Sequence, residues 1–178
     1  MSLRHAPLAA RLAPHLLPLL VRWLPAPEPA LLLELGSGTG EQAVHLAARL
    51  PWLTWQPSDP DPESRASIAA WTARAGVPNV LPPLTLDLLA PAWRLRTCDA
   101  LLLVNVLHAA PPGATEALLA GAAGVLPRGG PLLVVEPAAG AAGAPLAALE
   151  AQAPRHGLAI AERRSLGEGC AGLVLRLR

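Results

Sequence analysis

Four short apolar runs in the sequence each end in an acid, an amide or a turn of glycines, the residue types that hold the polar groups of a ligand. The first run, 30–35, carries one acid and leads directly into glycines spaced by two. These positions are Glu34, Gly36, Gly38 and Gly40, and the residues after the other three runs are Asp59, Asp87 and Asn105. In an open α/β sheet, ligands bind in the crevice outside the carboxyl ends of the strands. We therefore expect these residues to share one binding crevice.

The glycine turn is typical of a site for a nucleotide-like ligand. Its residues, Gly36-Ser-Gly-Thr-Gly40, give the backbone small steps at which a ligand can come close. The stretch from Gly38 to Ala43 also fits the GxGxxA pattern, so a nicotinamide dinucleotide stays an alternative. Glu34, however, lies two residues before a turn that has no basic residue, and its charge would meet a pyrophosphate. Electrostatics instead favours a ligand that carries an amine and a sulfonium.

The two later acids extend this interpretation to the rest of the ligand. We expect Asp59 to accept both ribose hydroxyls and Asp87 to accept from an adenine amino group, a combination that fits S-adenosylmethionine. The predicted cofactor-binding residues are Glu34, Gly36, Ser37, Gly38, Thr39, Gly40, Asp59, Asp87, Leu88 and Asn105. Two alternatives stay open, because Asp87 is also suited to cap the turn after it and Asn105 to contribute only its backbone.

His108 is the one imidazole at this rim and the only candidate for a general base, and no other catalytic residue is assigned. A structural histidine is an equal alternative. Methyl transfer from a sulfonium is an in-line displacement with an activated donor, for which proximity and alignment supply about 7–11 kcal/mol in favourable cases. A base is needed only if the acceptor must lose a proton.

The elements that would position these residues alternate along the chain. The predicted strands are 30–35, 53–56, 80–86, 100–104, 132–135, 158–164 and 172–178, and the predicted helices are 19–24, 41–50, 62–75, 115–126 and 146–153. Pro82 and Pro83 assign their strand to a sheet edge, because proline donates no ladder bond. The last two strands alternate apolar and polar residues and form an antiparallel hairpin. The low-complexity stretch 138–144 is expected to be a loop. Strand–helix units with a closing hairpin predict an α/β fold.

The domain boundaries follow from the prolines near the N-terminus. Residues 1–29 are expected to form a helical segment and a proline-rich linker, and residues 30–178 one Rossmann-like domain. Pro18 is assigned to the first turn of a short helix, because a proline inside a helix removes a hydrogen bond.

Composition and charge exclude several classes of function. The chain has 14 basic and 13 acidic residues and a net charge of +1, so no nucleic-acid partner is expected. Cys98 and Cys170 stand apart in the sequence, and no metal site is predicted. No apolar run reaches the roughly 18 residues that span a bilayer, so we expect a cytoplasmic protein without a membrane partner. The sequence does not indicate an oligomeric state.

Several motifs resemble class I S-adenosylmethionine-dependent methyltransferases. They are Glu-Leu-Gly-Ser-Gly-Thr-Gly at 34–40, the acid after the second strand, Leu-Asp-Leu at 86–88 and Leu-Pro-Arg-Gly-Gly at 126–130. The stretches 37–47, 53–59 (Leu-Thr-Trp-Gln-Pro-Ser-Asp), 79–84 and 114–118 are similar to an uncharacterised methyltransferase-like family. The resemblance covers about residues 30–136. It implies a three-layer αβα sandwich with a seven-stranded, mostly parallel sheet in the order 3-2-1-4-5-7-6, with S-adenosylmethionine as cofactor and S-adenosylhomocysteine as product.

The sequence departs from that family at three places. Gln42 stands where the family usually has a histidine, and Arg11-Leu12 where it usually has Arg-Asn. After the fifth strand, 136–145 replaces a longer insertion, so the part that would cover an acceptor is short. The favoured function is an S-adenosylmethionine-dependent methyltransferase for an unidentified small-molecule acceptor. The alternatives are a cofactor-binding scaffold without an acceptor site and an NAD-dependent dehydrogenase.

Overall fold

The computed structural model of the chain describes residues 3–24, 26–90, 92–93, 95, 97–138 and 144–178. The chain forms two compact units, Met1–Leu86 and Asp87–Arg178. The division expected at residue 30 stays a prediction, and most of the loop expected at 138–144 lies outside the described residues. Within the described part of the chain, no helix has the length and apolar character needed to cross a membrane.

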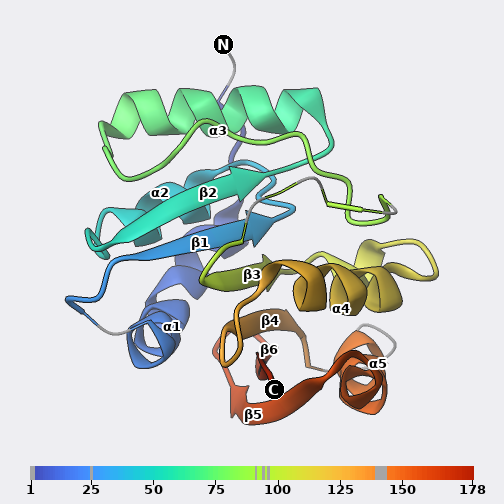
Figure 1. The fold of residues 1–178 in the computed structure, drawn as a ribbon. Coiled ribbons are helices and arrows are strands. Elements are labelled where there is room, and N and C mark those ends of the chain that lie inside the picture. The colour runs from blue at the N-terminus through green and yellow to red at the C-terminus, as the bar shows by residue number, and fades with distance from the viewer. Residues whose placement is uncertain (1–2, 25, 91, 94, 96, 139–143) are drawn as a thin grey trace. The chain divides into compact units, whose positions relative to one another are not determined.

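The first unit contains a parallel pair of strands and three helices (Figure 1). Its elements are α1 (Pro7–Trp23), β1 (Ala30–Leu35), α2 (Glu41–Ala47), β2 (Leu53–Ser58) and α3 (Pro62–Ala75). The two strands run in the same direction with Leu32 opposite Trp55, and both of these side chains are fully buried. Parallel strands covered on both faces read as continuous apolar runs, which is why β1 was predictable from its sequence.

Helix α3 begins and ends as its sequence predicts. Asp61 accepts hydrogen bonds from the backbone N–H groups of Glu63 and Ser64, both at 3.1 Å, and Pro62 occupies the first turn. Gly76 ends the helix in the left-handed conformation, at a φ of 62°. The cap matters for the site because it settles the role of Asp61 and separates it from its neighbour Asp59.

Helix α1 corrects the prediction for the N-terminus. It is a single helix of 17 residues that contains both Pro14 and Pro18, whereas we expected Pro18 to start a short helix. Both prolines lie on the exposed side, where water can bind the carbonyls that lose their helical partners. The opposite side buries Leu12, Leu16, Leu19 and Leu20, and this apolar stripe holds the helix together.

The stretch 80–86 corrects the predicted sheet. It forms only two isolated bridges to β2, Trp55–Val80 and Ser58–Leu84, and not a strand. Pro82 and Pro83 lie between the bridges and have no N–H groups to extend the pairing. The described residues therefore contain six strands, not seven, and the predicted order 3-2-1-4-5-7-6 is wrong.

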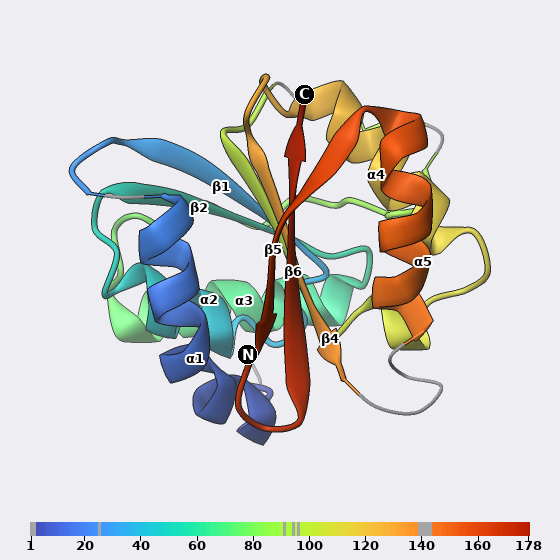
Figure 2. The same cartoon turned by 90° about the horizontal axis from the view of Figure 1, so that it is seen from below.

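The second unit is a four-stranded mixed sheet with helices. Its elements are β3 (Ala100–Val104), the short 3₁₀ helix η1 (Leu107–Ala109), α4 (Ala114–Val125), β4 (Pro131–Pro137), α5 (Ala144–Gln152), the 3₁₀ helix η3 (Ala153–His156), β5 (Leu158–Ser165) and β6 (Cys170–Leu177). The strand order is β3-β4-β6-β5, with β3 parallel to β4 and β6 antiparallel to both of its neighbours. Figure 2 shows the β5–β6 hairpin. The α/β class and the closing antiparallel hairpin are confirmed.

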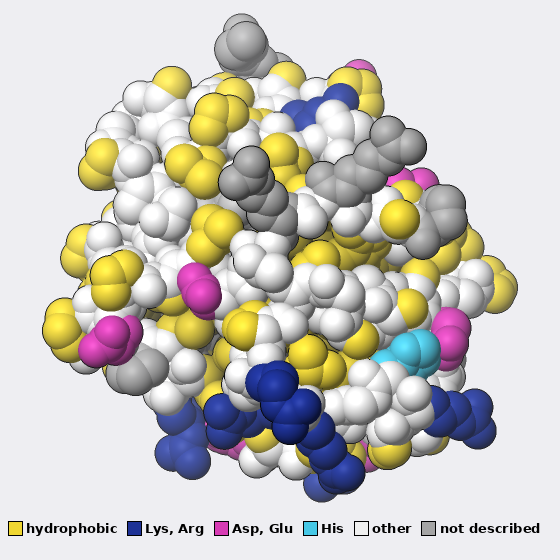
Figure 3. All heavy atoms as spheres, in the orientation of Figure 1, with side chains coloured by type: hydrophobic (Ala, Val, Ile, Leu, Met, Phe, Trp, Pro, Cys, Tyr) yellow, Lys and Arg dark blue, Asp and Glu magenta, His cyan; other side chains and the backbone are white. Residues whose placement is uncertain are grey.

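The hairpin differs from its predicted pattern in which residues are buried. We expected Leu173 and Leu175 to alternate with exposed residues, but Val174 between them is also buried. Strand β6 lies between β4 and β5, so both of its faces are covered. Strand β5 is the outer strand and is mostly exposed. Figure 3 shows arginine side chains along the lower edge of the molecule, where β5 lies in Figure 1. Charges on an outer strand discourage pairing with another sheet.

Candidate functional site

The glycine turn between β1 and α2 has the backbone that its sequence predicts. Gly36, Gly38 and Gly40 all have positive φ, at 64°, 56° and 81°. At Gly40, a Cβ atom would lie 2.6 Å from the Cα of Ile68 in α3, so only glycine fits there. At Gly38, a Cβ atom would meet nothing within 4 Å. The turn is therefore packed against α3 at one end and open at its middle glycine.

The hydroxyl groups of the turn hold it in place. Ser37 accepts a hydrogen bond from the backbone N–H of Ser58 at 3.1 Å, and its own N–H donates to the Ser58 carbonyl at 2.9 Å. Thr39 accepts from the N–H of Glu41 at 3.3 Å. These contacts tie the turn to the ends of β2 and α2, so Ser37 and Thr39 shape the turn whether or not they also contact a ligand.

Asp59 lies next to the turn, as the sequence predicts. Its Oδ2 accepts a hydrogen bond from the N–H of Gly38 at 2.9 Å, and its Oδ1 accepts from the N–H of Asp61 at 2.9 Å. The residue is 7% exposed. Each carboxylate oxygen has two lone pairs, so one acceptor site on each oxygen is left for a ligand hydroxyl.

Glu34 is buried and has partners that the sequence did not reveal. Its Oε2 accepts from the indole Nε1 of Trp55 at 3.0 Å, and its Oε1 accepts from the side-chain amide of Gln42 at 3.5 Å. Burial raises the pKa of Glu34 from its ordinary value of 4.5 to about 7, although these donors oppose the shift. The side chain is thus only partly ionised near neutral pH. This corrects the sequence argument, which assumed a full negative charge.

The N-terminal residues pack against the same turn and helices, which the sequence did not suggest. The backbone N–H of Ala6 donates to Glu41 Oε2 at 2.8 Å, and that of Arg4 donates to Ser67 Oγ at 3.1 Å. Ser67 in turn donates to the Thr39 carbonyl at 2.9 Å. Glu41, the first residue of α2, is 8% exposed, so a carboxyl group already occupies the helix end.

In the second unit, Asp87 has the local role that was left open as an alternative. Its Oδ1 accepts from the N–H of Leu89 at 2.9 Å, and its carbonyl accepts from the N–H of Ala90 at 3.1 Å. Asp87 is exposed and Leu88 is half-buried. The contacts are those of a turn-capping aspartate, and its expected adenine contact stays a prediction, as does a role for Leu88.

Asn105 follows β3 in an unusual backbone conformation. Its φ is 55°, one of two positive values among the described residues other than glycine. Its N–H donates to the Val135 carbonyl of β4 at 2.8 Å, and its side-chain oxygen is 3.9 Å from the sulfur of Cys170. The left-handed residue turns the chain sharply into η1, which brings His108 back toward the end of β4.

Glu136 on β4 organises this turn, and the sequence analysis gave it no role. Its Oε1 accepts from the N–H groups of Val106 and Leu107 at 2.8 and 2.7 Å. Its Oε2 lies 3.2 Å from the N–H of His108 and 2.8 Å from the Nδ1 of the same residue. Glu136 is fully buried, whereas the His108 side chain is 32% exposed. A buried carboxylate with four donors therefore holds a partly exposed imidazole.

The structure thus groups the predicted residues within each unit. The first unit brings together Glu34, the glycine turn and Asp59, and the second brings together Asn105 and His108 with Glu136. Sequence reasoning missed Glu136, although it is an acid directly after a buried run, the pattern that singled out Asp59. It also missed the donors Trp55 and Gln42.

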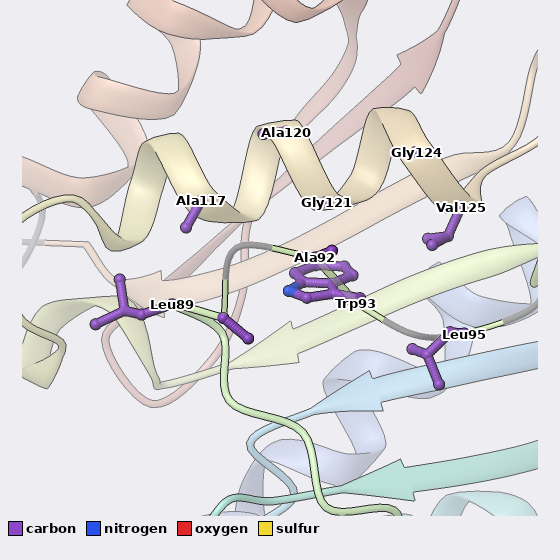
Figure 4. Close-up of a pocket in the computed structure, with 10 residues that line it drawn as sticks. Leu89, Ala92, Trp93, Leu95, Ala117, Ala120, Gly121, Gly124 and Val125 are labelled. Carbon is purple, nitrogen blue, oxygen red and sulfur yellow. The ribbon is translucent and has the colours of Figure 1, made fainter.

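A pocket of about 390 Å³ in the second unit lies elsewhere (Figure 4). It runs along α4, and Trp93 packs closely on Gly121, where a Cβ atom would be 2.5 Å from the indole ring. Its described lining residues are Leu89, Ala90, Ala92, Trp93, Leu95, Ala117, Ala120, Gly121, Gly124 and Val125. None of these has a titratable side chain, so the pocket offers packing and no acid–base chemistry. Among the described residues, no group of three or more His, Cys, Asp or Glu residues could hold a metal ion.

Solved structures similar to this chain are methyltransferases. The S-adenosylmethionine-dependent methyltransferase SibL, in its apo form, has a TM-score of 0.74 and 21% identity over 96% of this chain and 55% of its own. A SAM-dependent methyltransferase from Aquifex aeolicus has a TM-score of 0.73 and 16% identity over 97% of this chain and 94% of its own.

An O-methyltransferase family 2 protein from Planctomyces limnophilus, in complex with apigenin, has a TM-score of 0.72 and 20% identity over 94% of this chain and 58% of its own. This chain thus spans little more than half the length of SibL and of the Planctomyces protein. The likeness shows a Rossmann-like fold. A family model described as protein of unknown function (DUF938) matches residues 4–146, a longer stretch than the expected resemblance, and the chain belongs to this family.

Proposed function

We propose that the chain is an S-adenosylmethionine-dependent methyltransferase that acts on a small-molecule acceptor. The observation that carries the proposal is the hydrogen bond of 2.9 Å between Asp59 Oδ2 and the N–H of Gly38. It fixes a buried carboxylate beside an open glycine turn, and this is the arrangement that a ribose with two free hydroxyls requires. Similar structures that are methyltransferases support the same conclusion.

The same turn and acid would also suit a nicotinamide dinucleotide, so the choice depends on charge. A dinucleotide places its pyrophosphate at the N-terminus of the helix after the turn. Here that helix begins with the buried Glu41, and Glu34 lies below the turn. Even with Glu34 partly protonated, a pyrophosphate would meet carboxyl groups and no basic side chain of the turn. An amine and a sulfonium are favoured at the same place.

The residues of the first unit fit the cofactor in a simple way. Gly38 leaves room for close approach, Asp59 keeps acceptor capacity for two hydroxyls, and Glu34 is available to an amine either directly or through water. When bound, the cofactor supplies an activated methyl group. The chain then needs mainly to align the acceptor with that group.

A ligand titration tests the proposal. S-adenosylhomocysteine and NADH are added side by side while the melting temperature is followed, and we expect a rise with S-adenosylhomocysteine alone. A rise with NADH alone would favour a dehydrogenase, and no shift with either compound at millimolar concentration would contradict cofactor binding. If S-adenosylhomocysteine binds but radiolabelled S-adenosylmethionine yields no methylated product with any acceptor class, the chain is a cofactor-binding scaffold.

A further inference from the structure

We infer that the Nε2 of His108 is a general base that removes a proton from a hydroxyl group of the acceptor, with Glu136 as the residue that positions it. The inference rests on the proposed function and assigns the acceptor to a class, phenols and other acidic hydroxyl compounds.

The first step of the argument concerns the hydrogen on the imidazole. Glu136 Oε2 is 2.8 Å from His108 Nδ1, and Glu136 has no exposed surface. An ionised carboxyl group only accepts hydrogen bonds, so Nδ1 must carry the hydrogen. In the neutral ring, Nε2 is then the nitrogen with the free lone pair. The contact therefore fixes the tautomer that leaves Nε2 as the basic atom.

The second step concerns the direction and stiffness of the ring. The same carboxyl group accepts the backbone N–H groups of Val106, Leu107 and His108. Backbone and imidazole are thus attached to one buried anchor, which limits movement of the ring. Because 32% of the His108 side chain is exposed while Nδ1 is engaged, Nε2 is accessible at the carboxyl ends of β3 and β4. Ligands bind at these ends in folds of this class.

The third step compares this pair with a second one in the same unit. His156 Nε2 lies 3.0 Å from Glu116 Oε1, but there the carboxylate is 59% exposed and the imidazole only 16%. That pair covers its histidine and leaves its acid in solvent. The pair at His108 has the reverse order, with a buried acid and an accessible base, which is the order that proton transfer to a histidine needs. His156 is therefore a matched control.

Other titratable groups near the base belong to β6 and the turn before it. Cys170 lies close enough to Glu136 that the charge of Glu136, together with burial, raises the pKa of the thiol, and Glu168 contributes in the same direction. The thiol therefore stays protonated near neutral pH and does not compete for the acceptor proton. Asn105, whose side-chain oxygen faces the thiol sulfur, has no charge to change with pH.

In the proposed step, the O–H bond of the acceptor breaks and its proton moves to His108 Nε2. The oxygen forms a bond to the methyl carbon while the bond from that carbon to sulfur breaks, and the electron pair stays on sulfur. The sulfonium becomes a neutral thioether, and His108 later releases its proton to water. The imidazolium is formed beside Glu136, which stabilises its positive charge.

The first test needs no acceptor. Nitrogen-15 NMR of the histidine rings in the full chain is expected to show His108, once neutral, with hydrogen on Nδ1 and none on Nε2. Glu136→Gln should lose that fixed tautomer, while His156→Gln should leave the His108 signals unchanged. A His108 ring with hydrogen on Nε2 would overturn the inference, because no basic nitrogen would then face the acceptor.

The second test uses radiolabelled S-adenosylmethionine with apigenin, catechol, a primary amine and a thiol. We expect product from a hydroxyl compound, a loss of kcat of about 100-fold or more in His108→Gln with little change in the KM of the acceptor, and an unchanged rate in His156→Gln. The activity of His108→Gln should recover as the pH approaches the range where the phenol ionises by itself. No product from a hydroxyl compound, or full activity in His108→Gln, would overturn the inference. Failure of S-adenosylhomocysteine to bind would instead contradict the proposed function.

Discussion

Glu34 and Glu136 are both buried acids near the carboxyl ends of parallel strands, yet their surroundings differ. Glu34 has two side-chain donors, one of them at 3.5 Å, and its pKa rises to about 7. Glu136 is contacted by three backbone N–H groups and an imidazole, all within 3.2 Å. Burying a carboxylate is tolerated when donors replace water. The comparison shows that donor number, not depth of burial, decides which acid can serve as a fixed anchor.

The largest expected effect is on stability when the Glu136 anchor is removed. Glu136→Ala should lower the free energy of unfolding by about 3–5 kcal/mol, because it leaves four donors without their acceptor. Urea denaturation followed by circular dichroism measures the loss. Glu116→Ala is the control, and its exposed, paired carboxylate should contribute less than about 1 kcal/mol. A loss below about 1 kcal/mol for Glu136→Ala would mean that the four contacts do not hold the turn.

The second effect is a pH dependence that belongs to Glu34. Its pKa in the folded chain, about 7, lies above the ordinary value of 4.5, so between these values the folded chain holds a proton that the unfolded chain has released. This contribution to stability is complete below pH 4.5 and is lost as the pH rises through about 7, by up to about 3 kcal/mol.

Glu34→Gln tests this dependence, since Gln42 can turn its amide to keep the contact while the titrating group is gone. Urea denaturation at several values between pH 5 and pH 8 should show the variant gaining stability relative to the original chain as the pH rises. A difference that does not change with pH would show that Glu34 stays ionised throughout, as a carboxylate with enough donors would.

The smallest effect sharpens the role of donors directly. Trp55→Phe removes the indole N–H that lowers the pKa of Glu34, so the pH range over which stability is lost should move upward. The accompanying loss of stability should be on the order of 1–2 kcal/mol. In Trp52→Phe, whose indole donates to the Leu24 carbonyl, the range should stay where it was. Equal shifts in both variants would separate the effect from the Glu34 contact.

The difference between the two acids also shows what the sequence could predict. The glycine turn, Asp59 and the cap of α3 are local patterns, in which spacing along the chain already fixes the geometry. Glu136 meets its partners across 28 to 30 residues, and the N-terminal contacts of Arg4 and Ala6 span 63 and 35 residues. Such contacts depend on tertiary packing, and no spacing rule reveals them.

The errors in the fold have physical causes of the same kind. The prolines of α1 were read as breaks because their cost is local, whereas the apolar stripe that outweighs it acts through packing. The alternation in β6 predicted one exposed face, but a strand between two neighbours is covered on both. The prolines at 82 and 83 did suggest a sheet edge, and in fact they reduce that edge to isolated bridges.

Isothermal titration of the full chain with S-adenosylhomocysteine, repeated for Asp59→Ala and Asp61→Ala, tests the proposed cofactor site most directly. We predict binding to the original chain, at least about tenfold weaker binding to Asp59→Ala through lost hydroxyl contacts, and a change within about threefold for Asp61→Ala, which affects only the helix cap. Asp59→Asn should fall between the two, since it keeps one oxygen. Undetectable binding to the original chain, or equal affinity in Asp59→Ala, would contradict the assignment of this turn to S-adenosylmethionine.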